Sequence, residues 1–347
     1  MLYLRNKTNK VHVGNITIGG QNKVVIQSMT NTKTSNVSDT LSQIQQLVKN
    51  GCELVRVAIF DELDLDGLKE ICNKVDCPIV ADIHYNYLYA IKAIKLGAKK
   101  IRINPGNISN KKQLIQIINI ANEYKAAIRI GINTGSLPKN VKPTVSNIIK
   151  CAKQWIKFFE NNNFTNLVIS LKSSNAFLTK DLYLKAASQI KYPLHLGVTE
   201  AGSIIDATMK STVGLYGLLK QGIGDTIRIS ISGSPLDEPI VAKKLLSIAG
   251  IKQNLTNVIA CPTCGRCQYN LDELLSKIET YVNTNPKELT IAIMGCSVNG
   301  VGECKHANIG VYGVAKNKVM LIKDGKDFGV FSTNEALKQF INIYNNY

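Results

Sequence analysis

Three cysteines in a C-x-x-C-x-x-C pattern and a fourth thiol in a glycine-rich segment are the residues of this chain best suited to hold a metal. The first group is Cys261, Cys264 and Cys267, and the second segment runs Gly295-Cys296-Ser-Val-Asn-Gly-Val-Gly-Glu303. Thiols at such spacings hold either structural zinc or an iron–sulfur cluster. A zinc ribbon usually has two C-x-x-C halves, whereas the second half here is one cysteine followed by glycines and a carboxylate, which favours iron–sulfur. Spacing alone selects Cys261, Cys264, Cys267 and Cys296 as ligands.

The use of cysteine also bears on the compartment. The chain has nine cysteines, and Met1–Lys10 lacks the apolar stretch of a secretory signal. Thiols persist in reducing compartments, so we expect a cytoplasmic protein. No apolar run approaches the roughly 20 residues that span a bilayer, so no membrane partner is expected. The remaining thiols in the first half of the chain are expected to be buried small hydrophobic groups: Cys52, Cys72, Cys77 and Cys151.

An arginine between two β-branched residues recurs in four predicted strands. The segments are Val55-Arg56-Val57, Ile101-Arg102-Ile103, Ile128-Arg129-Ile130 and Ile227-Arg228-Ile229. Because side chains alternate along a strand, the apolar residues face the helices and each arginine points inward. Lys172 ends another strand, and the carboxylates near strand ends are Asp82 and Glu200. Buried unpaired charges are costly, so this surplus of cations needs further anions.

The inward cations predict a pocket for a phosphorylated, and more specifically a diphosphorylated, small molecule. Guanidinium groups match phosphate oxygens bidentately, and the carboxyl ends of barrel strands are where active sites form. An internal salt-bridge network is the alternative interpretation. Candidates to orient the hydroxyl groups of a ligand lie at or just beyond the same strand ends: His84, Asn104, Asn133 and Ser230. His195 is more typical of a structural histidine.

Eight short β-branched segments alternate with helical patterns and must position these residues. They are Val24–Met29, Glu53–Ile59, Pro78–Ile83, Lys99–Asn104, Ala126–Ile132, Leu167–Lys172, Pro193–Val198 and Thr226–Ile231. The predicted fold class is α/β: a (β/α)8 TIM barrel over residues 1–250, followed by a small α+β iron–sulfur cluster domain over residues 256–347. A hairpin over Val11–Gly20 precedes the barrel. An open doubly wound sheet is the runner-up, but no Gly-x-Gly-x-x-Gly turn follows the first strand.

The formal charge of +17 has several interpretations. It could serve an anionic substrate, an acidic protein partner or nucleic acid, or it could reflect a composition rich in lysine, asparagine and isoleucine. The lysines are scattered, and no basic stripe interleaved with aromatic residues is present, so nucleic acid is not expected as a partner.

Many segments along nearly the whole chain resemble the bacterial 4-hydroxy-3-methylbut-2-enyl diphosphate synthase family. This family is the iron–sulfur enzyme of the methylerythritol phosphate route to isoprenoids. The resemblance rests on Gln27-Ser-Met-Thr-Asn-Thr, Val80-Ala-Asp-Ile-His84, Arg102-Ile-Asn-Pro-Gly-Asn107, Arg129-Ile-Gly-Ile-Asn133, Leu194-His-Leu-Gly-Val-Thr-Glu-Ala-Gly202, Gly222-Ile-Gly-Asp-Thr-Ile-Arg228, Ala260-Cys-Pro-Thr-Cys-Gly-Arg266 and Gly295-Cys-Ser-Val-Asn-Gly.

The resemblance implies a [4Fe-4S] cluster held by Cys261, Cys264, Cys296 and Glu303, which exchanges Cys267 for a carboxylate. It implies that 2-C-methyl-D-erythritol 2,4-cyclodiphosphate undergoes two-electron reductive ring opening and loss of water to (E)-4-hydroxy-3-methylbut-2-enyl diphosphate. The family's diphosphate-binding positions fall on Arg56, Arg102, Arg129, Lys172 and Arg228, with Ser230 beside them. Glu200 and Asp82 are implied in proton handling, while His84, Asn104 and Asn133 would hold the substrate.

The resemblance also implies partners. Electrons would come from a flavodoxin or ferredoxin, and the chain would form a homodimer in which one chain's cluster module caps the other chain's barrel. Two departures from the family pattern concern the cluster segment. Val301 stands where the family has proline, so we expect a looser loop before Glu303, and Cys304 offers a rival ligand.

Two other classes of protein remain open at this stage. One is a zinc-stabilised nucleic-acid-binding protein, which the charge and the clustered cysteines motivate. The inward arginines disfavour it, because nucleic-acid contacts need exposed cations. The second is a different phosphate-binding barrel enzyme with a structural metal, such as a pterin-type synthase.

Overall fold

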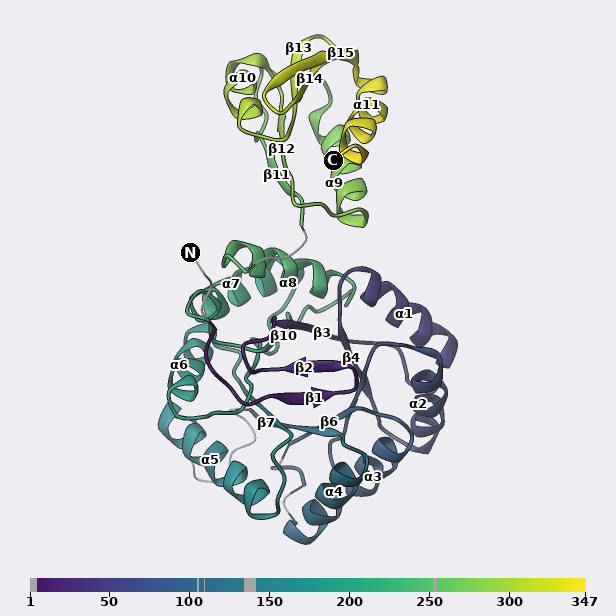
Figure 1. The fold of residues 1–347 in the computed structure, drawn as a ribbon, viewed down its shortest axis with the longest axis vertical. Helices are drawn as coiled ribbons and strands as arrows, with labels where there is room; N and C mark the ends of the chain where they lie inside the picture. Colours follow the sequence, from purple (N-terminus) through teal and green to yellow (C-terminus); the bar gives the residue numbers. More distant parts are fainter. Residues whose placement is uncertain (1–4, 105, 109, 134–141, 252–254) are drawn as a thin grey trace. The chain divides into compact units, whose positions relative to one another are not determined.

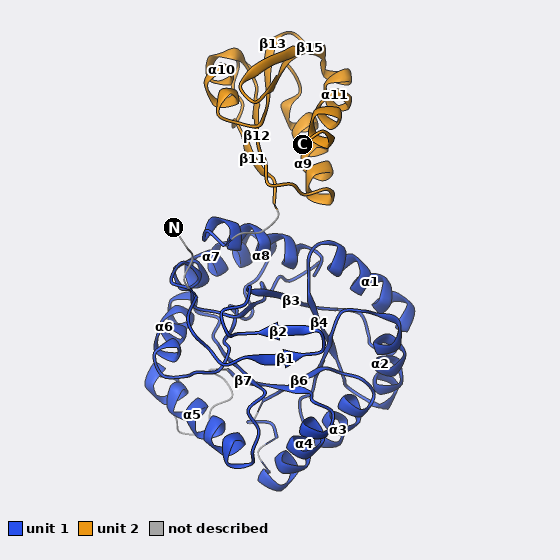
Figure 2. Cartoon of the chain, in the orientation of Figure 1, with its two compact units in different colours: residues 1–252 blue, residues 253–347 orange. Residues whose placement is uncertain are grey.

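The computed structural model describes residues 5–104, 106–108, 110–133, 142–251 and 255–347, with the side chain of Asn133 also outside the description. The chain divides into two compact units, residues 1–252 and residues 253–347, which Figure 2 shows in different colours.

The first unit is a parallel barrel surrounded by helices (Figure 1). Its strands in chain order are β3 (Val25–Met29), β4 (Leu54–Ala58), β5 (Ile79–Asp82), β6 (Lys100–Ile103), β7 (Ala127–Asn133), β8 (Leu167–Lys172), β9 (His195–Leu196) and β10 (Thr226–Ile227). Hydrogen bonding joins them in the order β8-β7-β6-β5-β4-β3-β10-β9. A parallel bridge between Ile169 and Leu194 closes β8 onto the segment that leads into β9. The predicted TIM barrel is confirmed.

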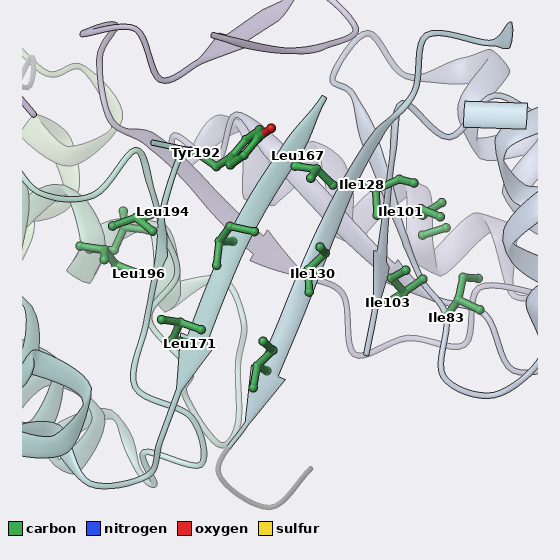
Figure 3. Close-up of a cluster of buried hydrophobic side chains, with 14 of the residues drawn as sticks. Ile83, Ile101, Ile103, Ile128, Ile130, Leu167, Leu171, Tyr192, Leu194 and Leu196 are labelled. Atoms are coloured by element: carbon green, nitrogen blue, oxygen red, sulfur yellow. The ribbon is translucent and has the colours of Figure 1, made fainter. Parts of the chain in front are cut away.

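The surrounding helices follow the strands in alternation. They are α1 (Val37–Lys49), α2 (Glu62–Lys74), α3 (Tyr87–Lys95), α4 (Lys111–Glu123), α5 (Val145–Asn161), α6 (Ala176–Ala187), α7 (Ile204–Lys220) and α8 (Asp237–Ile248). Their apolar faces pack on the outward side chains of the strands in one large core. Figure 3 shows part of this core, with Ile101 and Ile103 of β6 and Ile128 and Ile130 of β7. These four isoleucines flank Arg102 and Arg129, as period-two alternation requires.

A short hairpin closes the amino-terminal end of the barrel. Its strands are β1 (Val11–Val13) and β2 (Ile16–Ile18), which pair antiparallel and cross the barrel in Figure 1. Their buried side chains pack against the first inward residues of the barrel strands, such as Leu54, Val80 and Val168. The hairpin predicted at Val11–Gly20 is therefore confirmed, and only the opposite, carboxyl end of the barrel carries the inward arginines.

Strands β9 and β10 are shorter than the segments predicted at Pro193–Val198 and Thr226–Ile231. Gly197 explains part of the difference, because a Cβ atom at this position would lie 2.7 Å from the carbonyl oxygen of Arg228. The two backbones thus approach closely and leave regular pairing directly after Leu196 and Ile227. The residues beyond these points form irregular segments at the end of the barrel that carries the arginines.

The second unit has a mixed five-stranded sheet in the order β11-β12-β13-β14-β15. Its elements are β11 (Asn257–Ala260), α9 (Leu271–Thr284), β12 (Thr290–Met294), α10 (Ser297–Lys305), β13 (Ile309–Ala315), β14 (Lys318–Lys323), β15 (Lys326–Ser332) and α11 (Thr333–Asn345). One core lies between the sheet and helices α9 and α11, and a smaller one includes Cys304 of α10. The predicted α+β class is confirmed, although the sequence pattern did not predict β15.

Candidate active site

The inward cations of the barrel meet in a cavity of about 210 Å³. The register places Asp82, Arg102 and Arg129 in one row across β5, β6 and β7. The described residues that line the cavity are Arg56, Asp82, His84, Arg102, Arg129, Gly131, Ser170, Lys172, Thr199, Arg228 and Ser230. All five predicted cations are therefore brought together, with His84, Asp82 and Ser230 beside them.

Asp82 holds two of the arginines. Its carboxylate accepts a hydrogen bond from Arg102 Nη1 at 3.2 Å and lies 3.7 Å from Arg56 Nε. His84 Nε2 lies 3.7 Å from Asp82 and 3.3 Å from Arg102 Nη1. Burial by itself would raise the pKa of Asp82, but Arg56, the hydrogen bond with His84 and Arg102 together hold this pKa well below its usual range. Asp82 is therefore ionised and can accept a proton but does not supply one.

A second carboxylate, that of Glu238, lies behind the cavity wall and pairs with Arg228, and sequence reasoning missed it. It lies in the first turn of α8, is 1% exposed, and binds Arg228 through two hydrogen bonds of 2.9 Å. Its only sequence signal is a position shortly after Arg228, at the start of the next predicted helix. Among the described residues, Asp82 and Glu238 thus face five cations, which leaves a surplus of three positive charges.

Arg129 and Lys172 account for much of that surplus. Both are buried, and within the described part of the chain no carboxylate lies within ion-pair distance of either. Burial and then the neighbouring arginines disfavour their charged forms, so the pKa of Lys172 lies well below its ordinary value. Arg129 Nε is also buried, and no hydrogen-bond partner for it lies among the residues that the structure describes. A bound dianion would satisfy these groups, whereas the alternative of a balanced internal salt-bridge network does not hold for them.

Two glycines make room for the cations. A Cβ atom on Gly131 would lie 3.0 Å from Arg102 Nε, and one on Gly197 would lie 3.0 Å from Lys172 Nζ. A side chain at either position would therefore press on a cation and shift it.

Three of the predicted site residues are not among the described residues that line the cavity. Asn104 is buried, and its side-chain oxygen accepts the N–H of Gly106 at 3.0 Å. Glu200 is exposed and has a φ of 52°, a left-handed conformation that is strained for glutamate and often marks a functional position. The side chain of Asn133 lies outside the described residues, although its backbone ends β7.

The cysteine segments of the second unit meet at the end of strands β11 and β12. The backbone N–H of Cys261 donates to Ile293, and the N–H of Gly295 donates to Cys261 Sγ at 3.2 Å. Cys296 is the N-cap residue of α10. The loop that carries Cys264 ends next to Gly295, since the N–H of Gln268 donates a hydrogen bond of 2.9 Å to the carbonyl oxygen of Gly295.

Glu303 lies on the same helix as Cys296, seven residues further along. This spacing is two helical turns, so both residues share a face, and helical side chains lean toward the N-terminus. Glu303 is exposed. The expectation of a loose loop at Val301 is wrong, because residues 297–305 form helix α10 and the intrahelical hydrogen bonds order this segment without proline.

Cys267 and Cys304 have other roles in the structure. Cys267 Sγ donates to the carbonyl oxygen of Tyr269 at 3.1 Å and packs on Gly295, where a Cβ atom would lie 2.7 Å from this sulfur. Cys304 is fully buried beneath α10, and burial raises the pKa of its thiol to about 12. Cys304 is therefore not available as the rival ligand that its position beside Glu303 suggested.

Within the described residues, no three histidine, cysteine or acidic side chains already stand close enough to hold a metal ion. The donors nevertheless fit an iron–sulfur cluster chemically. All three thiols are free, two lie on short segments that the sheet fixes, and a backbone N–H already donates to one sulfur, as in thiolate-bound clusters. Cluster binding would then draw the loop of Cys264 and the side chain of Glu303 inward.

A larger cavity of about 790 Å³ lies elsewhere, along α5 and α6. Its walls carry lysines such as Lys150, Lys153 and Lys157, and none of the residues that the sequence motifs single out. We therefore place the chemistry at the smaller, charged cavity. Among the described residues, no helix is both long and apolar enough to cross a membrane.

Comparison with known proteins identifies relatives that cover most of the chain. The family model described as GcpE TIM-barrel domain matches residues 8–243, and that of the GcpE protein C-terminal domain matches residues 257–346. A curated relative from Malacoplasma penetrans is 49% identical, with 89% of this chain and 87% of that protein covered. Relatives from Mycoplasmoides gallisepticum (93% and 91% covered) and Anoxybacillus flavithermus (93% and 90%) are 48% and 44% identical. All three are named 4-hydroxy-3-methylbut-2-en-1-yl diphosphate synthase (flavodoxin).

Solved structures similar to this chain include dihydropteroate synthases. The enzyme from Yersinia pestis has a TM-score of 0.51 and 12% identity, with 70% of this chain and 97% of that chain covered. The enzyme from Vibrio fischeri has a TM-score of 0.53 and 13% identity, with 70% and 99% covered. At such low identity these likenesses show the barrel fold alone. Neither a pterin-type synthase nor a zinc-stabilised nucleic-acid-binding protein is supported by the relatives.

Proposed function

Since the chain belongs to the GcpE family of 4-hydroxy-3-methylbut-2-en-1-yl diphosphate synthases, enzymes of isoprenoid biosynthesis, we propose how its own residues carry out that reaction. The enzyme is an oxidoreductase that reduces 2-C-methyl-D-erythritol 2,4-cyclodiphosphate to (E)-4-hydroxy-3-methylbut-2-enyl diphosphate. Two electrons and two protons enter, the ring carbon–oxygen bond to phosphate breaks, and one hydroxyl leaves as water. The cationic surplus of the barrel cavity is the observation that carries our assignment of the substrate site.

In this proposal the diphosphate binds in the barrel cavity. Arg129 and Lys172, which lack carboxylate partners among the described residues, pair with its oxygens. Arg56, Arg102 and Arg228 are already fixed by carboxylates and present their remaining N–H groups. Ser230 and His84 line the same cavity and orient the substrate, and Asn104 and Asn133, at neighbouring strand ends, support its edge.

Proton handling is assigned to Glu200, with Asp82 as an acceptor. The exposed Glu200 follows Thr199, which lines the cavity, and so can exchange protons with water and approach the leaving hydroxyl. Asp82 is held ionised by Arg56 and Arg102. A bound diphosphate adds negative charge beside it, which raises the affinity of Asp82 for a proton.

We further propose that Cys261, Cys264, Cys296 and Glu303 hold a [4Fe-4S] cluster. When bound, the cluster supplies single electrons and an iron with an exchangeable carboxylate ligand. A flavodoxin, which the relatives' names include, is the proposed electron donor, with ferredoxin as the alternative. We also propose a barrel domain over residues 1–250, a cluster domain over residues 256–347, a homodimer, and a cytoplasmic location that keeps the free thiols reduced.

Anaerobic purification tests the cluster. We expect a brown protein with about four iron atoms per chain, which converts the cyclic diphosphate when reduced flavodoxin is supplied. A Cys296→Ala chain should lose the iron but keep the barrel's affinity for the cyclic diphosphate. A colourless wild-type protein that contains zinc would contradict the proposal.

The homodimer is tested with two inactive chains. Arg129→Met and Cys296→Ala chains are purified separately and then mixed. If the barrel of one chain uses the cluster of another, part of the activity returns on mixing. If a chain serves only itself, the mixture stays inactive.

A further inference from the structure

Strand β3 contributes polar groups to the site without lining the cavity. Gln27 Oε1 accepts hydrogen bonds from Lys100 Nζ at 3.2 Å and Arg129 Nη1 at 3.4 Å. The sulfur of Met29 accepts one from Arg56 Nε at 3.0 Å. Between these residues, Ser28 points to the other face of the strand, and its hydroxyl donates to Glu238 Oε2 at 2.6 Å. Residues 27–29 therefore support three arginine side chains, either directly or through Glu238.

Glu238 is the most constrained of these groups. One carboxylate oxygen accepts from Arg228 Nη2 at 2.9 Å and from the N–H of Ile231 at 3.2 Å. The other accepts from Arg228 Nε at 2.9 Å and from Ser28. Each oxygen thus has two donors, and the residue is 1% exposed. A carboxylate saturated in this way cannot itself bind substrate.

The hydrogen bonds from Arg228 to Glu238 determine which nitrogen atom of the guanidinium group can bind a ligand. The Nε and Nη2 edge is held by Glu238, so the guanidinium plane is set. In the described part of the chain, Nη1 donates to the weak acceptor Met29 Sδ at 3.7 Å. A buried bidentate pair of this kind holds an arginine within a narrow range of orientations. Orientation has large kinetic effects, because a misplacement of about 1 Å can cost roughly a hundredfold in rate.

We propose that Glu238, supported by Ser28, is a positioning residue that aims Arg228 at the substrate diphosphate, and that Gln27 supports Arg129 in the same way. This inference rests on the proposed function of the cavity. It gives a role to the β3 segment Gln27-Ser28-Met29, which contacts the arginines directly or through Glu238 and is not among the residues that line the cavity. Glu238 acts through Arg228 and exchanges no proton with the substrate.

A double-mutant cycle tests the proposal in the full-length, cluster-loaded enzyme. The four proteins are the wild type, Glu238→Gln, Arg228→Met and the double variant. In the wild-type background, Glu238→Gln should lower kcat/KM by roughly tenfold or more. In the Arg228→Met background, the same change should alter kcat/KM by less than about twofold. A purely structural Glu238 would lower kcat/KM equally in both backgrounds, and that result overturns the proposal.

The division of the effect between kcat and KM gives a second readout. Arg228 keeps its charge in Glu238→Gln and still attracts the diphosphate, so kcat should fall more than KM rises. Thermal unfolding of the same proteins gives a third. Arg228→Met leaves Glu238 buried without its partner, so adding Glu238→Gln should raise the melting temperature of that variant. A further fall in melting temperature would contradict the pairing.

Ser28→Ala covers the case in which Glu238→Gln fails to fold, because it removes one hydrogen bond and no charge. We expect a kcat/KM about threefold lower than wild type, and no change when Arg228 is already Met. Glu53→Gln is the matched control. Glu53 also accepts a backbone N–H beside β3, that of Ile26, but it lies at the other end of the strand and should leave kcat/KM unchanged. If the wild type does not turn over the cyclic diphosphate, the proposed function fails; if it does and the cycle is additive, only the positioning role fails.

Discussion

Replacing Cys304 by alanine is expected to leave the iron content of the enzyme unchanged while it weakens the fold of the second unit. Cys304 is fully buried between α10 and the sheet, and its thiol donates a long, weak hydrogen bond to the carbonyl oxygen of Ala292 at 3.8 Å. Its side chain packs in the smaller core of the second unit, whereas the adjacent Glu303 is exposed, so Cys304 does not face the site proposed for the cluster. Its contribution is therefore one of packing.

The packing around Cys304 sets the size of the effect. Cys304 lies against Gly310, where a Cβ atom would approach Cys304 Cβ to 2.3 Å, and it shares a small core with Ala292 and Tyr312. Deleting one buried sulfur resembles deleting one buried methyl group, which costs about 1 kcal/mol of unfolding free energy. For a unit of this size, residues 253–347, that corresponds to roughly 5 °C in melting temperature.

The assay compares iron per chain and thermal unfolding, both under anaerobic conditions, for Cys304→Ala, Cys267→Ala and Cys296→Ala. Cys304→Ala should keep wild-type iron and melt a few degrees lower. Cys267→Ala should also keep its iron, because the sulfur of Cys267 is engaged with Tyr269. Cys296→Ala should lose the iron. Loss of iron from Cys304→Ala with unchanged stability would refute this account of the cysteine roles.

Three further predictions concern the barrel. Binding of the cyclic diphosphate should take up a proton, because burial and then Arg129 and other arginines lower the pKa of Lys172 in the free enzyme, and the bound anion raises it again. Affinity should then fall as pH rises through the lowered pKa. Calorimetry in buffers of different ionisation enthalpy should show this uptake for the wild type and not for Lys172→Met. Lys100→Met should raise the unfolding free energy at pH 7 by about 1–3 kcal/mol. Burial and then Arg129 lower the pKa of Lys100, so the folded state binds fewer protons than the unfolded state, and wild-type stability should rise with pH toward the ordinary lysine pKa. Equal or lower stability of Lys100→Met would show that the hydrogen bond to Gln27 offsets the cost of burying this amine. Glu200→Gln should lower kcat by about a hundredfold in an anaerobic assay, and full activity would remove the proton role.

The inward arginines could be predicted because their signal is local. Side chains alternate between the two faces of a strand. An arginine between two β-branched core residues, as in Ile101-Arg102-Ile103, must therefore point to the face opposite to theirs. The same rule extends to Lys100, which lies two residues before Arg102 and is fully buried. Lys100 directly follows Lys99 in the sequence, and two adjacent lysines usually indicate an exposed segment, so this signal was missed. The number of inward cations was therefore underestimated by the sequence pattern.

Other features of the site depend on contacts that no local pattern carries. Glu238 meets Arg228 across a turn into α8, and Ser28 meets Glu238 across 210 positions of sequence. Cys304 follows Glu303 directly, but a helix turns adjacent residues about 100° apart, so one faces solvent and the other the core. These placements follow from how helices dock on the sheet, which spacing alone cannot give.

The cationic layer of the barrel links folding to substrate binding. Lys100, Arg129 and Lys172 are buried, and within the described residues none of them lies at ion-pair distance from a carboxylate, so they lower the stability of the free barrel. Gln27 relieves part of this cost for two of them, because its side-chain oxygen accepts hydrogen bonds from both Lys100 and Arg129. A ligand that binds only the folded state stabilises it in proportion to its affinity. The same charges that destabilise the free barrel should therefore make the cyclic diphosphate a strong stabiliser of the fold. Because Glu238 and Asp82 fix the orientation of their arginines, only an anion whose shape matches these orientations should stabilise the barrel in this way.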